Sequence, residues 1–407
     1  MISSFHRFAL AGTAIPALAL AACNFAPAAV PEQKSATPAA ANTAAPQLNS
    51  VESAFASHDD VAATEAEDKQ RPVMQAQVLL DRLGFAPGVI DDKMGMSTVN
   101  AIKGFQEANE LPQSGKLDEA TTAAILKQKN LPATRMVTIP QEFLDQQFVK
   151  IPADAQAKGK LPALAYENAM EALAERFHTT PAALAELNPA LGATAASAPP
   201  HNERADGKPV EKVVPAADQA NAAKPGELTL TAGQKIRVPN IGGDAITRIE
   251  GMDANWKQTL AHLGVATEQP KAAKVVVSKS KGTLRAYDEA GKMLVQFTAT
   301  MGSKHDPLPL GEWKVNGVAY NPTFNYNPEL FWDVSNDKPK VKMPAGPNSP
   351  VGVVWIDINK PHYGIHGTPS PETIGRAESH GCVRLTNWDA ARLALMVKPG
   401  TQVLFEA

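Results

Sequence analysis

The spacing of apolar residues changes along the chain, and it is helical in the segment 71–130. Apolar positions recur there every three or four residues, in three groups: Val78, Leu79 and Leu83; Ala101, Ile102 and Phe105; Ala123, Ile125 and Leu126. This period predicts three short helices around one small core. Gly84 is placed to end the first helix and Asp118 to cap the third.

A second, less regular helical stretch lies in residues 160–241. One predicted helix ends near Phe177, another at Leu187, and a strand follows Gly233 and Gln234. A stretch rich in Ala and Pro, from about 193 to 226, interrupts this module. Residues 131–159 are expected to be a linker, and the sequence NWKQTLAHLGV predicts a linker helix within 242–273.

From about residue 274 the pattern changes to short β-branched and alternating runs. They are KVVVSK, TLRAYD, MLVQFTAT, EWKVNGVAY and GVVWIDI, separated by turn sequences such as DEAGK and NPTFNYNP. The segment 274–407 is therefore predicted to be a mostly β domain. One helix is expected at NWDAARLALMV, with Asn387 as its cap, followed by a turn and the strand TQVLFEA.

The first 22 residues have the features of an export signal: a basic Arg7, a short apolar stretch, and then small residues. The run Leu20-Ala21-Ala22-Cys23 resembles the lipobox of bacterial lipoproteins, in which the cysteine is acylated. The alternative is ordinary cleavage after Ala21, which leaves a periplasmic protein without lipid. Residues 23–70 are rich in Ala, Pro, Ser and Thr and predict a disordered tether.

The lipobox resemblance implies a protein of the periplasm or cell envelope, held to a membrane by its N-terminal lipid. Asn24 follows the lipid cysteine in place of the aspartate associated with inner-membrane retention, which favours the outer membrane. Composition excludes one partner class. The net charge is -3, with no local basic patch, so nucleic-acid binding is not expected.

The 407 residues include two cysteines, and lipidation of Cys23 would leave Cys382 without a disulfide partner. An unpaired thiol in an oxidising compartment is either buried and inert or used. Cys382 lies in ESHGCVRLT, and three of the nine histidines, at 362, 366 and 380, lie within twenty residues of it. A thiolate needs a base or a positive environment, and spacing alone leaves His366 and His380 both eligible.

The sequence HGT at 366–368, followed by SHGCVR at 379–384, resembles the signature of the L,D-transpeptidase family, also called the YkuD domain. The similarity runs from about residue 274 to the C-terminus and implies a β-sandwich with one helix. It makes Cys382 the nucleophile, His366 the base and later acid, and the carbonyl of Gly367 the group that orients the imidazole. The remaining motif residues, expected to line the site, are His380, Gly381 and Arg384.

The resemblance also implies the reaction. The thiolate attacks the carbonyl of the third residue of a peptidoglycan tetrapeptide stem, D-alanine leaves, and an amine resolves the thioester into a 3-3 cross-link. Water, a free D-amino acid or a protein lysine would serve as other acceptors. Backbone N–H groups of Gly381 and Cys382 are expected to hold the oxyanion, and Arg384 either pairs with a substrate carboxylate or braces the loop. No cofactor is implied. We expect protonated His366 to stabilise the Cys382 thiolate.

Two resemblances connect the preceding segments to peptidoglycan. The stretches GVIDDKMGMSTVNAI and GKLDEATTAAI echo each other, and with IKGFQEANEL they resemble the peptidoglycan-binding domain type 1 family over 71–130. The helices of 160–241, with Asn188-Pro189 and LTAGQKIRVPN, resemble a LysM glycan-binding module, although its usual Gly-Asp-Thr entry is absent. Both are expected to bind the wall, and segment 71–130 is expected to be separable from the chemistry.

Three other readings of the last domain stay open. His362, His366, His380 and Cys382 supply four possible zinc ligands, although His366 cannot be both ligand and base. A lipoprotein that only anchors the envelope to the wall would not need a thiol beside histidines. An L,D-carboxypeptidase or a cysteine peptidase of the wall would share the acyl-enzyme and differ in the second step.

Overall fold

The protein was studied as a computed structural model, which describes residues 70–128, 130–189, 230–242, 251–331, 334–335 and 337–407. All of them belong to one compact unit, residues 46–407. The predicted signal peptide, the lipidation site Cys23, nearly all of the predicted tether and the Ala/Pro-rich stretch lie outside the described residues. Within the described ranges, no helix is both long enough and apolar enough to cross a bilayer.

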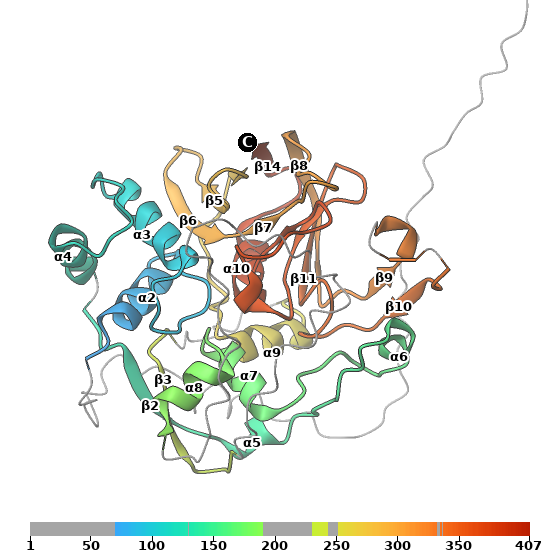
Figure 1. Ribbon diagram of the computed structural model, residues 1–407, viewed down its shortest axis with the longest axis horizontal. Coiled ribbons are helices and arrows are strands. Elements are labelled where there is room, and N and C mark those ends of the chain that lie inside the picture. Colours follow the sequence, from blue (N-terminus) through green and yellow to red (C-terminus); the bar gives the residue numbers. More distant parts are fainter. Residues whose placement is uncertain (1–69, 129, 190–229, 243–250, 332–333, 336) are drawn as a thin grey trace, which may run out of the picture. The chain divides into compact units, whose positions relative to one another are not determined.

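Helices dominate the first part of the described chain and strands the last part (Figure 1). The helices are α2 (Pro72–Arg82), α3 (Met96–Ala108), α4 (Glu119–Gln128), α5 (Gln141–Leu144), α6 (Ala155–Gly159), α7 (Ala169–Arg176), α8 (Pro181–Leu187), α9 (Ala254–Leu263) and α10 (Asn387–Met396), with 3-10 turns η3 (Pro328–Leu330) and η4 (Pro371–Thr373). The strands are β1 (Phe85–Ala86), β2 (Thr134–Thr138), β3 (Lys235–Pro239), β4 (Lys274–Ser278), β5 (Thr283–Tyr287), β6 (Met293–Thr298), β7 (Thr300–Met301), β8 (Gly311–Tyr320), β9 (Phe324–Tyr326), β10 (Val341–Met343), β11 (Val354–Ile358), β12 (Gly364–His366), β13 (Val383–Arg384) and β14 (Gln402–Glu406). The helical N-terminal region and the mostly β C-terminal domain are thus confirmed.

The main sheet has the strand order β1-β6-β5-β4-β14-β8-β11-β12-β13-β7 in the described chain. Strands β6 and β7 stand near its opposite ends, yet only Ala299 separates them in sequence. In a flat sheet these two strands would lie eight strand spacings of about 4.8 Å apart, too far for one residue to connect them. The sheet must therefore fold back on itself. The long β8 makes the transition, because it pairs with β14 through residues 311–314 and with β11 through residues 315–320. The two halves enclose one apolar core.

Helices α9 and α10 complete this core. Trp256 and Leu260 of α9 are buried in it, so α9 belongs to the catalytic-domain core and is not the linker helix that was predicted. The helix α10 starts where it was predicted, but its cap is Thr386, whose hydroxyl accepts from the N–H of Asp389 at 3.1 Å. Asn387 is therefore the first helical residue, and its buried side chain is used elsewhere.

Two buried glutamines explain the internal echo in the N-terminal helical segment. Gln77 of α2 donates to the hydroxyl of Thr98 at 3.0 Å, and its carbonyl oxygen accepts from two N–H groups of the loop 91–92. Gln106 of α3 donates to the hydroxyl of Thr121 at 2.8 Å and accepts from the N–H of Gly115. Each glutamine thus organises the loop that leads into the next helix, and the repeated sequence reflects a repeated hydrogen-bond pattern.

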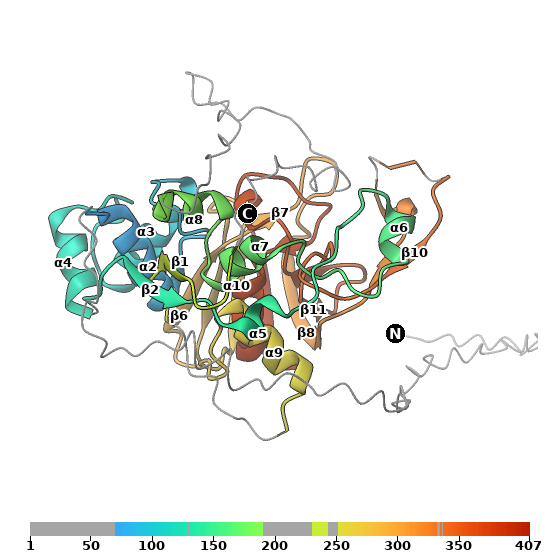
Figure 2. The same cartoon turned by 90° about the horizontal axis from the view of Figure 1, so that it is seen from below.

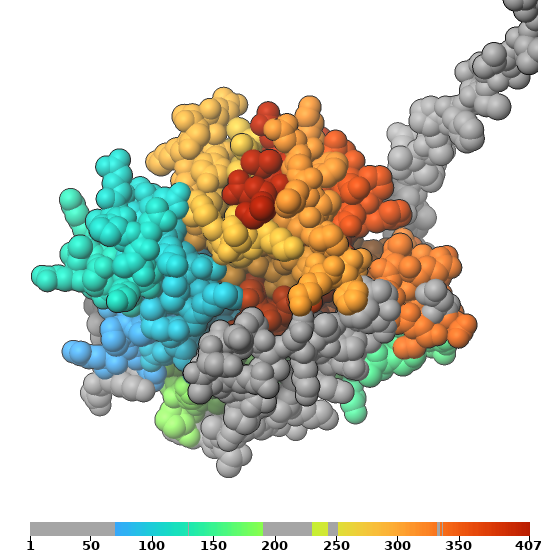
Figure 3. Space-filling view, turned by 45° about the horizontal axis from the view of Figure 1, so that its top comes forward, coloured from blue at the N-terminus to red at the C-terminus, as the bar shows by residue number. Residues whose placement is uncertain are grey.

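The same segment is joined to the main sheet. Strand β1 pairs in parallel with β6, and Arg285 of β5 makes a bidentate ion pair with Glu107 of α3 at 2.7 and 2.9 Å. A Cβ at Gly104 would come within 2.4 Å of the Gln296 side chain, which shows how closely α3 lies on β6. In Figure 3 the cyan surface of this segment abuts the yellow surface of the sheet.

The second helical stretch begins earlier than predicted. Strand β2 pairs antiparallel with β3, and the described helices between them in sequence are the short α5 and α6 and then α7 and α8. The predicted positions of both helices and of the closing strand are confirmed. The segment 131–159, expected as a linker, contains β2, α5 and α6, and Val137 of β2 is part of the core of this stretch.

Three segments far apart in sequence meet at the buried carboxylate of Asp81. It accepts two hydrogen bonds from Arg392 of α10, at 2.8 and 2.9 Å, and lies 3.1 Å from Nδ1 of His178, which follows α7. The His178 ring stacks on Trp388 at 4.9 Å, and its Nε2 lies 2.8 Å from the carbonyl of Leu263. Figure 2 shows α7, α9 and α10 grouped together around this junction.

Burial alone would raise the pKa of Asp81, but the Arg392 guanidinium and His178 lower it well below the usual range of an aspartate. We predict that Arg392→Met, which leaves the Asp81 charge buried without its main partner, destabilises the protein by about 3–5 kcal/mol. Urea unfolding followed by tryptophan fluorescence and circular dichroism will measure this. Lys340→Met, which breaks an exposed pair with Glu329, is the control and should leave the midpoint unchanged. Equal effects of the two changes would contradict the prediction.

Candidate functional site

Two parallel strands bring the two motif blocks together. Strand β12 pairs with β13, with Ile365 opposite Val383 and His366 opposite Arg384. Ile365 and Val383 are fully buried in the core, so the alternating neighbours project from the other face. Cys382, the residue before β13, therefore lies diagonally from His366 on one face, at a Cα separation of about 8 Å that side chains can bridge. This short ladder closes the loop of sixteen residues that connects the two strands.

The thiol of Cys382 is partly exposed and lies against the loop before β12. Its Sγ is 3.7 Å from the carbonyl oxygen of His362, a residue in the left-handed region at φ 67°. Gly381 has φ +95°, and a Cβ there would come within 2.5 Å of the Tyr363 ring. Glycine is thus required before the cysteine both for the turn and for the close approach of the tyrosine.

Ser379 fixes the turn that carries the thiol. Its hydroxyl donates to the carbonyl of Cys382 at 2.6 Å and accepts from the N–H of Gly302 at 2.6 Å. The side chain is buried, so both bonds are shielded from water. Ser379 stands in the recognised motif, but no role was predicted for it. A serine placed three residues before the end of a glycine-containing turn can donate to the last carbonyl of the turn. That spacing is the sequence signal that could have indicated a role for Ser379.

His366 is held in one orientation. Its Nδ1 lies 2.7 Å from the carbonyl oxygen of Gly367. A carbonyl only accepts, so Nδ1 carries the proton and Nε2 has the free lone pair. The imidazole stacks on Trp355 of β11, with ring centroids 5.5 Å apart. Gly364 leaves room for this indole, because a Cβ there would come within 2.5 Å of the Trp355 ring.

The surroundings of the pair favour neutral side chains. Burial, assisted by the charge of Arg384, lowers the pKa of His366 to about 3. Burial also raises the pKa of the Cys382 thiol, and the N–H of Gly364 and Arg384 offset this only in part. Both shifts favour the neutral forms, a thiol and a neutral imidazole. In the sequence analysis a thiolate beside protonated His366 was expected, and burial disfavours both of those charges.

The side chain of Asn387 separates two backbone segments beside His366. A Cβ at Gly352 would come within 1.9 Å of its Oδ1, and one at Gly367 within 2.2 Å. Its Oδ1 also accepts from the N–H of Val353 at 3.3 Å. The amide thus supports the peptide whose carbonyl orients the imidazole. In the sequence analysis Asn387 was assigned to helix capping. Its side chain is buried between glycines that are distant in the chain, and no local sequence pattern indicates such a position.

The other predicted residues lie nearby. Arg384 is mostly buried on the same face as His366, and the His380 ring packs edge-on against Phe331 with centroids 5.0 Å apart. The four residues proposed as zinc ligands do not converge. In the described part of the chain, no group of three or more His, Cys, Asp or Glu side chains is arranged to hold a metal ion.

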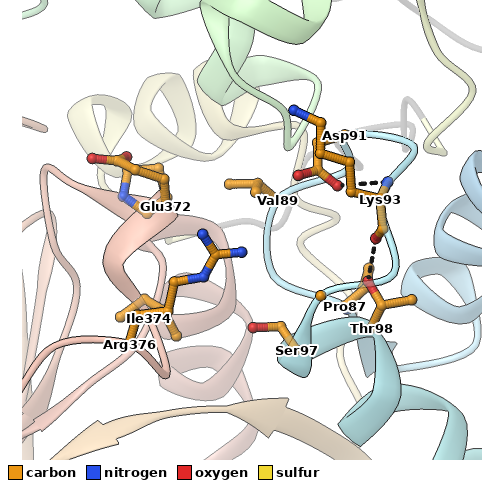
Figure 4. A pocket seen from close by; sticks show the side chains of 11 residues that line it. Pro87, Val89, Asp91, Lys93, Ser97, Thr98, Glu372, Ile374 and Arg376 are labelled. Atoms are coloured by element: carbon orange, nitrogen blue, oxygen red, sulfur yellow. Dashed lines mark hydrogen bonds between the residues drawn. The ribbon is translucent and has the colours of Figure 1, made fainter. Parts of the chain in front are cut away.

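The loop between the two motif blocks rests on the N-terminal helical segment. Pro371, Ile374 and Arg376 from this loop and Val89 and Ser97 from the helical segment line a small pocket (Figure 4). A Cβ at Gly375 would come within 3.0 Å of Met96, and one at Gly95 within 3.2 Å of Arg376. The helical segment therefore supports the chain just before the nucleophile.

Comparison with known families separates the chain into two matches. The L,D-transpeptidase catalytic domain family matches residues 272–404, and the family described as "Putative peptidoglycan binding domain" matches residues 69–125. The first match contains both motif blocks and the whole main sheet except β1 and the last two residues of β14. The second contains α2, α3 and most of α4.

Several proteins resemble the chain over part of their length. "Putative L,D-transpeptidase YkuD" of Bacillus licheniformis is 28% identical over 155 residues, which is 38% of this chain and 78% of that protein. "Probable L,D-transpeptidase YbiS" of Escherichia coli is 29% identical over 136 residues, 32% of this chain but only 44% of that protein. Among solved structures, an L,D-transpeptidase from Mycobacterium smegmatis shares 22% identity over 33% of this chain and 59% of that one, with a TM-score of 0.28.

Another relative is also matched over most of its length. "Putative L,D-transpeptidase YqjB" of Bacillus subtilis is 30% identical over 136 residues, which cover 32% of this chain and 69% of that protein. Together with the family match at 272–404 and the HGT and SHGCVR blocks that meet on β12 and β13, this similarity leads to one assignment: the chain belongs to the L,D-transpeptidase family.

Proposed function

We propose that the protein is a cysteine L,D-transpeptidase that acts on peptidoglycan stem peptides. The observation that carries the proposal is the β12–β13 ladder, which puts Cys382 and His366 on one face with the imidazole Nε2 free to accept a proton. Family membership supports the same reaction class. Peptidoglycan as substrate is supported by the two family matches, one catalytic and one peptidoglycan-binding.

The neutral resting pair suits a proton transfer that is coupled to attack. As the Cys382 sulfur approaches the carbonyl of the third stem residue, Nε2 of His366 takes the thiol proton. The Gly367 carbonyl holds Nδ1–H and stabilises the imidazolium that forms. The tetrahedral intermediate then collapses to a thioester, and the imidazolium gives its proton to the D-alanine amine that leaves. An acceptor amine attacks the thioester, with His366 again as base, and forms the new amide.

Backbone donors are available for the oxyanion. In the described residues, neither the N–H of Gly381 nor that of Cys382 donates to another backbone carbonyl. The turn bonded by Ser379 holds both groups in fixed positions. We assign them to the developing negative charge, where preorganised N–H donors contribute most. Arg384 and His380 line the same site, with Arg384 as a candidate partner for a stem carboxylate.

The acceptor decides between related activities. An amine of a second stem gives a 3-3 cross-link, a protein lysine gives an attached protein, and water makes the enzyme an L,D-carboxypeptidase. All of them use the same thioester. A protein that only anchors the envelope would have no need for the hydrogen bonds that hold His366 and the turn of Cys382 in position.

The remaining segments fit attachment to the wall and the envelope. The segment 71–130 is proposed to bind peptidoglycan, and the antiparallel pairing of β2 with β3, with α7 and α8 between them and α5 and α6 inserted after β2, supports a LysM-like glycan module. The protein is proposed to act in the periplasm, anchored by lipid on Cys23, with the outer membrane as the favoured location.

The first prediction concerns the nucleophile. Cys382→Ser should abolish both D-alanine release from a tetrapeptide stem and the covalent mass added by a carbapenem, because a hydroxyl is a much weaker acid and nucleophile than the thiol for which the site is arranged. Mass spectrometry of the intact protein and of the muropeptides measures both. Release of D-alanine by the serine variant at near wild-type rate, or a carbapenem adduct at another residue, would show that Cys382 is not the nucleophile.

The second prediction concerns pH. Alkylation of Cys382 by iodoacetamide needs the thiolate, and its pKa is raised, so the rate should keep rising with pH and level off only above the usual range of a cysteine pKa. His366 is neutral above about pH 3, so His366→Ala should change the rate below pH 8 by less than threefold. The same change should lower D-alanine release at least a hundredfold. Fast alkylation at pH 6 that His366→Ala removes would instead establish an ion pair.

The third prediction concerns the anchor. Wild-type protein should incorporate labelled palmitate and sediment with membranes, whereas Cys23→Ala should do neither, since the acyl chain is attached through the cysteine. Cys382→Ser is the matched control, because it removes the other thiol and should keep the label. Membrane association of the Cys23→Ala protein would mean that lipid on this residue is not the anchor.

A further inference from the structure

The amide of Asn387 is bonded on all sides. Its Nδ2 donates to Oε1 of Glu175 at 2.8 Å and to the carbonyl of Pro347 at 3.1 Å, while its Oδ1 accepts from the N–H of Val353. The side chain is fully buried. Because both amide protons and the carbonyl oxygen are used, only one orientation of the amide satisfies every group.

One of these three partners comes from outside the catalytic domain. Glu175 lies on α7, more than 200 residues before Asn387, and only 8% of it is exposed. The hydroxyl of Tyr166 is also hydrogen-bonded to this carboxyl. Burial raises the pKa of Glu175 to about 8, and the nearby Glu171 and Glu372 act in the same direction. At neutral pH the group is therefore an uncharged acid whose Oε1 is an acceptor.

A short series of contacts leads from Asn387 to the imidazole. The Asn387 Oδ1 lies so close to Gly367 that no side chain fits there, and the carbonyl of Gly367 is the acceptor for Nδ1 of His366. A turn of the amide would press on the Gly367 peptide and redirect its carbonyl. The Nδ1–H tautomer, and with it the free lone pair on Nε2, depends on this carbonyl.

We propose that Glu175 is a positioning residue for His366: by holding the Asn387 amide, helix α7 fixes the Gly367 carbonyl and so keeps the imidazole in its basic tautomer. The helical stretch before the catalytic domain thus completes the catalytic site. The effect on turnover rests on the proposed function, whereas the effect on the tautomer does not.

A matched control lies one turn earlier on the same helix. Glu171 also bonds to the catalytic domain, because its Oε1 accepts from Nδ2 of Asn348 at 2.8 Å, but it makes no bond to Asn387. A change at Glu171 tests whether loss of any contact between α7 and the catalytic domain has the same result. Glu175→Gln is the conservative variant, because its amide oxygen keeps the acceptor.

The experiment compares Glu175→Met, Glu175→Gln and Glu171→Met in the full chain, after thermal unfolding has established that each folds. Long-range ¹H–¹⁵N NMR of His366 reports the tautomer, and D-alanine release reports kcat and KM. Glu175→Met should give a mixture of tautomers and a kcat at least tenfold lower, with KM within twofold. Glu175→Gln should restore both readouts, and Glu171→Met should match the wild type in both. Glu175→Ala has the same expectations if the methionine variant does not fold.

Two results would overturn the proposal. The first is a folded Glu175→Met protein with the wild-type tautomer and kcat. The second is an equal loss in Glu171→Met, which would show that general docking of α7 is responsible. If the wild type itself releases no D-alanine, the proposed function fails, and the tautomer comparison still decides whether Glu175 positions His366.

Discussion

The buried carboxylate of Asp81 is the constraint on which the arrangement of this protein depends. A charge without solvent needs partners from whatever surrounds it, and here they come from α10 and from the residue after α7. The three helices α2, α7 and α10 cannot separate without leaving a charge unpaired in an apolar medium. The segments that resemble separate wall-binding modules are thereby built into the support of the catalytic domain. These segments therefore contact the protein close to the candidate site, since α10 begins five residues after Cys382.

The loops of the candidate site are held mainly by hydrogen bonds between buried polar side chains and backbone groups. Ser379 holds the carbonyl of Cys382, and Asn387 holds the peptides around Gly352 and Gly367. This leaves the two reacting groups few direct contacts of their own. Burial then determines their protonation, because neither an isolated thiolate nor an isolated imidazolium is favoured in such a site.

Local patterns predicted most of the elements. The alternating runs gave five strands, the apolar spacing gave the helices, and the echo in the N-terminal segment reflects the buried Gln77 and Gln106. Contacts between distant residues had no such signal. Nothing near Asn387 indicates that its side chain is needed by Gly352, and a helix cap was the reasonable local interpretation. The short β12 and β13 were also missed, because a strand of two or three residues shows no period.

The site was predicted through motif resemblance, and its protonation was not. Sequence proximity of three histidines to a thiol suggests an ion pair, but the charge state depends on how much water reaches the ring. The ring is buried and stacks on Trp355, which comes from a strand predicted only for its alternation. The position of Ser379 was visible in the motif, yet its partner Gly302 lies 77 residues away. The residue types thus indicated the chemistry, while tertiary packing determined the pKa values.

The place of β14 in the sheet has a consequence for biosynthesis. This strand lies between β4 and β8 and is hydrogen-bonded to both, although it comes after every other strand in the chain. Until residues 402–406 are in place, the two neighbours face each other across an empty position, and the parts of the sheet on either side have no common edge. A chain that emerges N-terminus first therefore remains incompletely folded until this strand arrives, which leaves the thiol of Cys382 without a finished site.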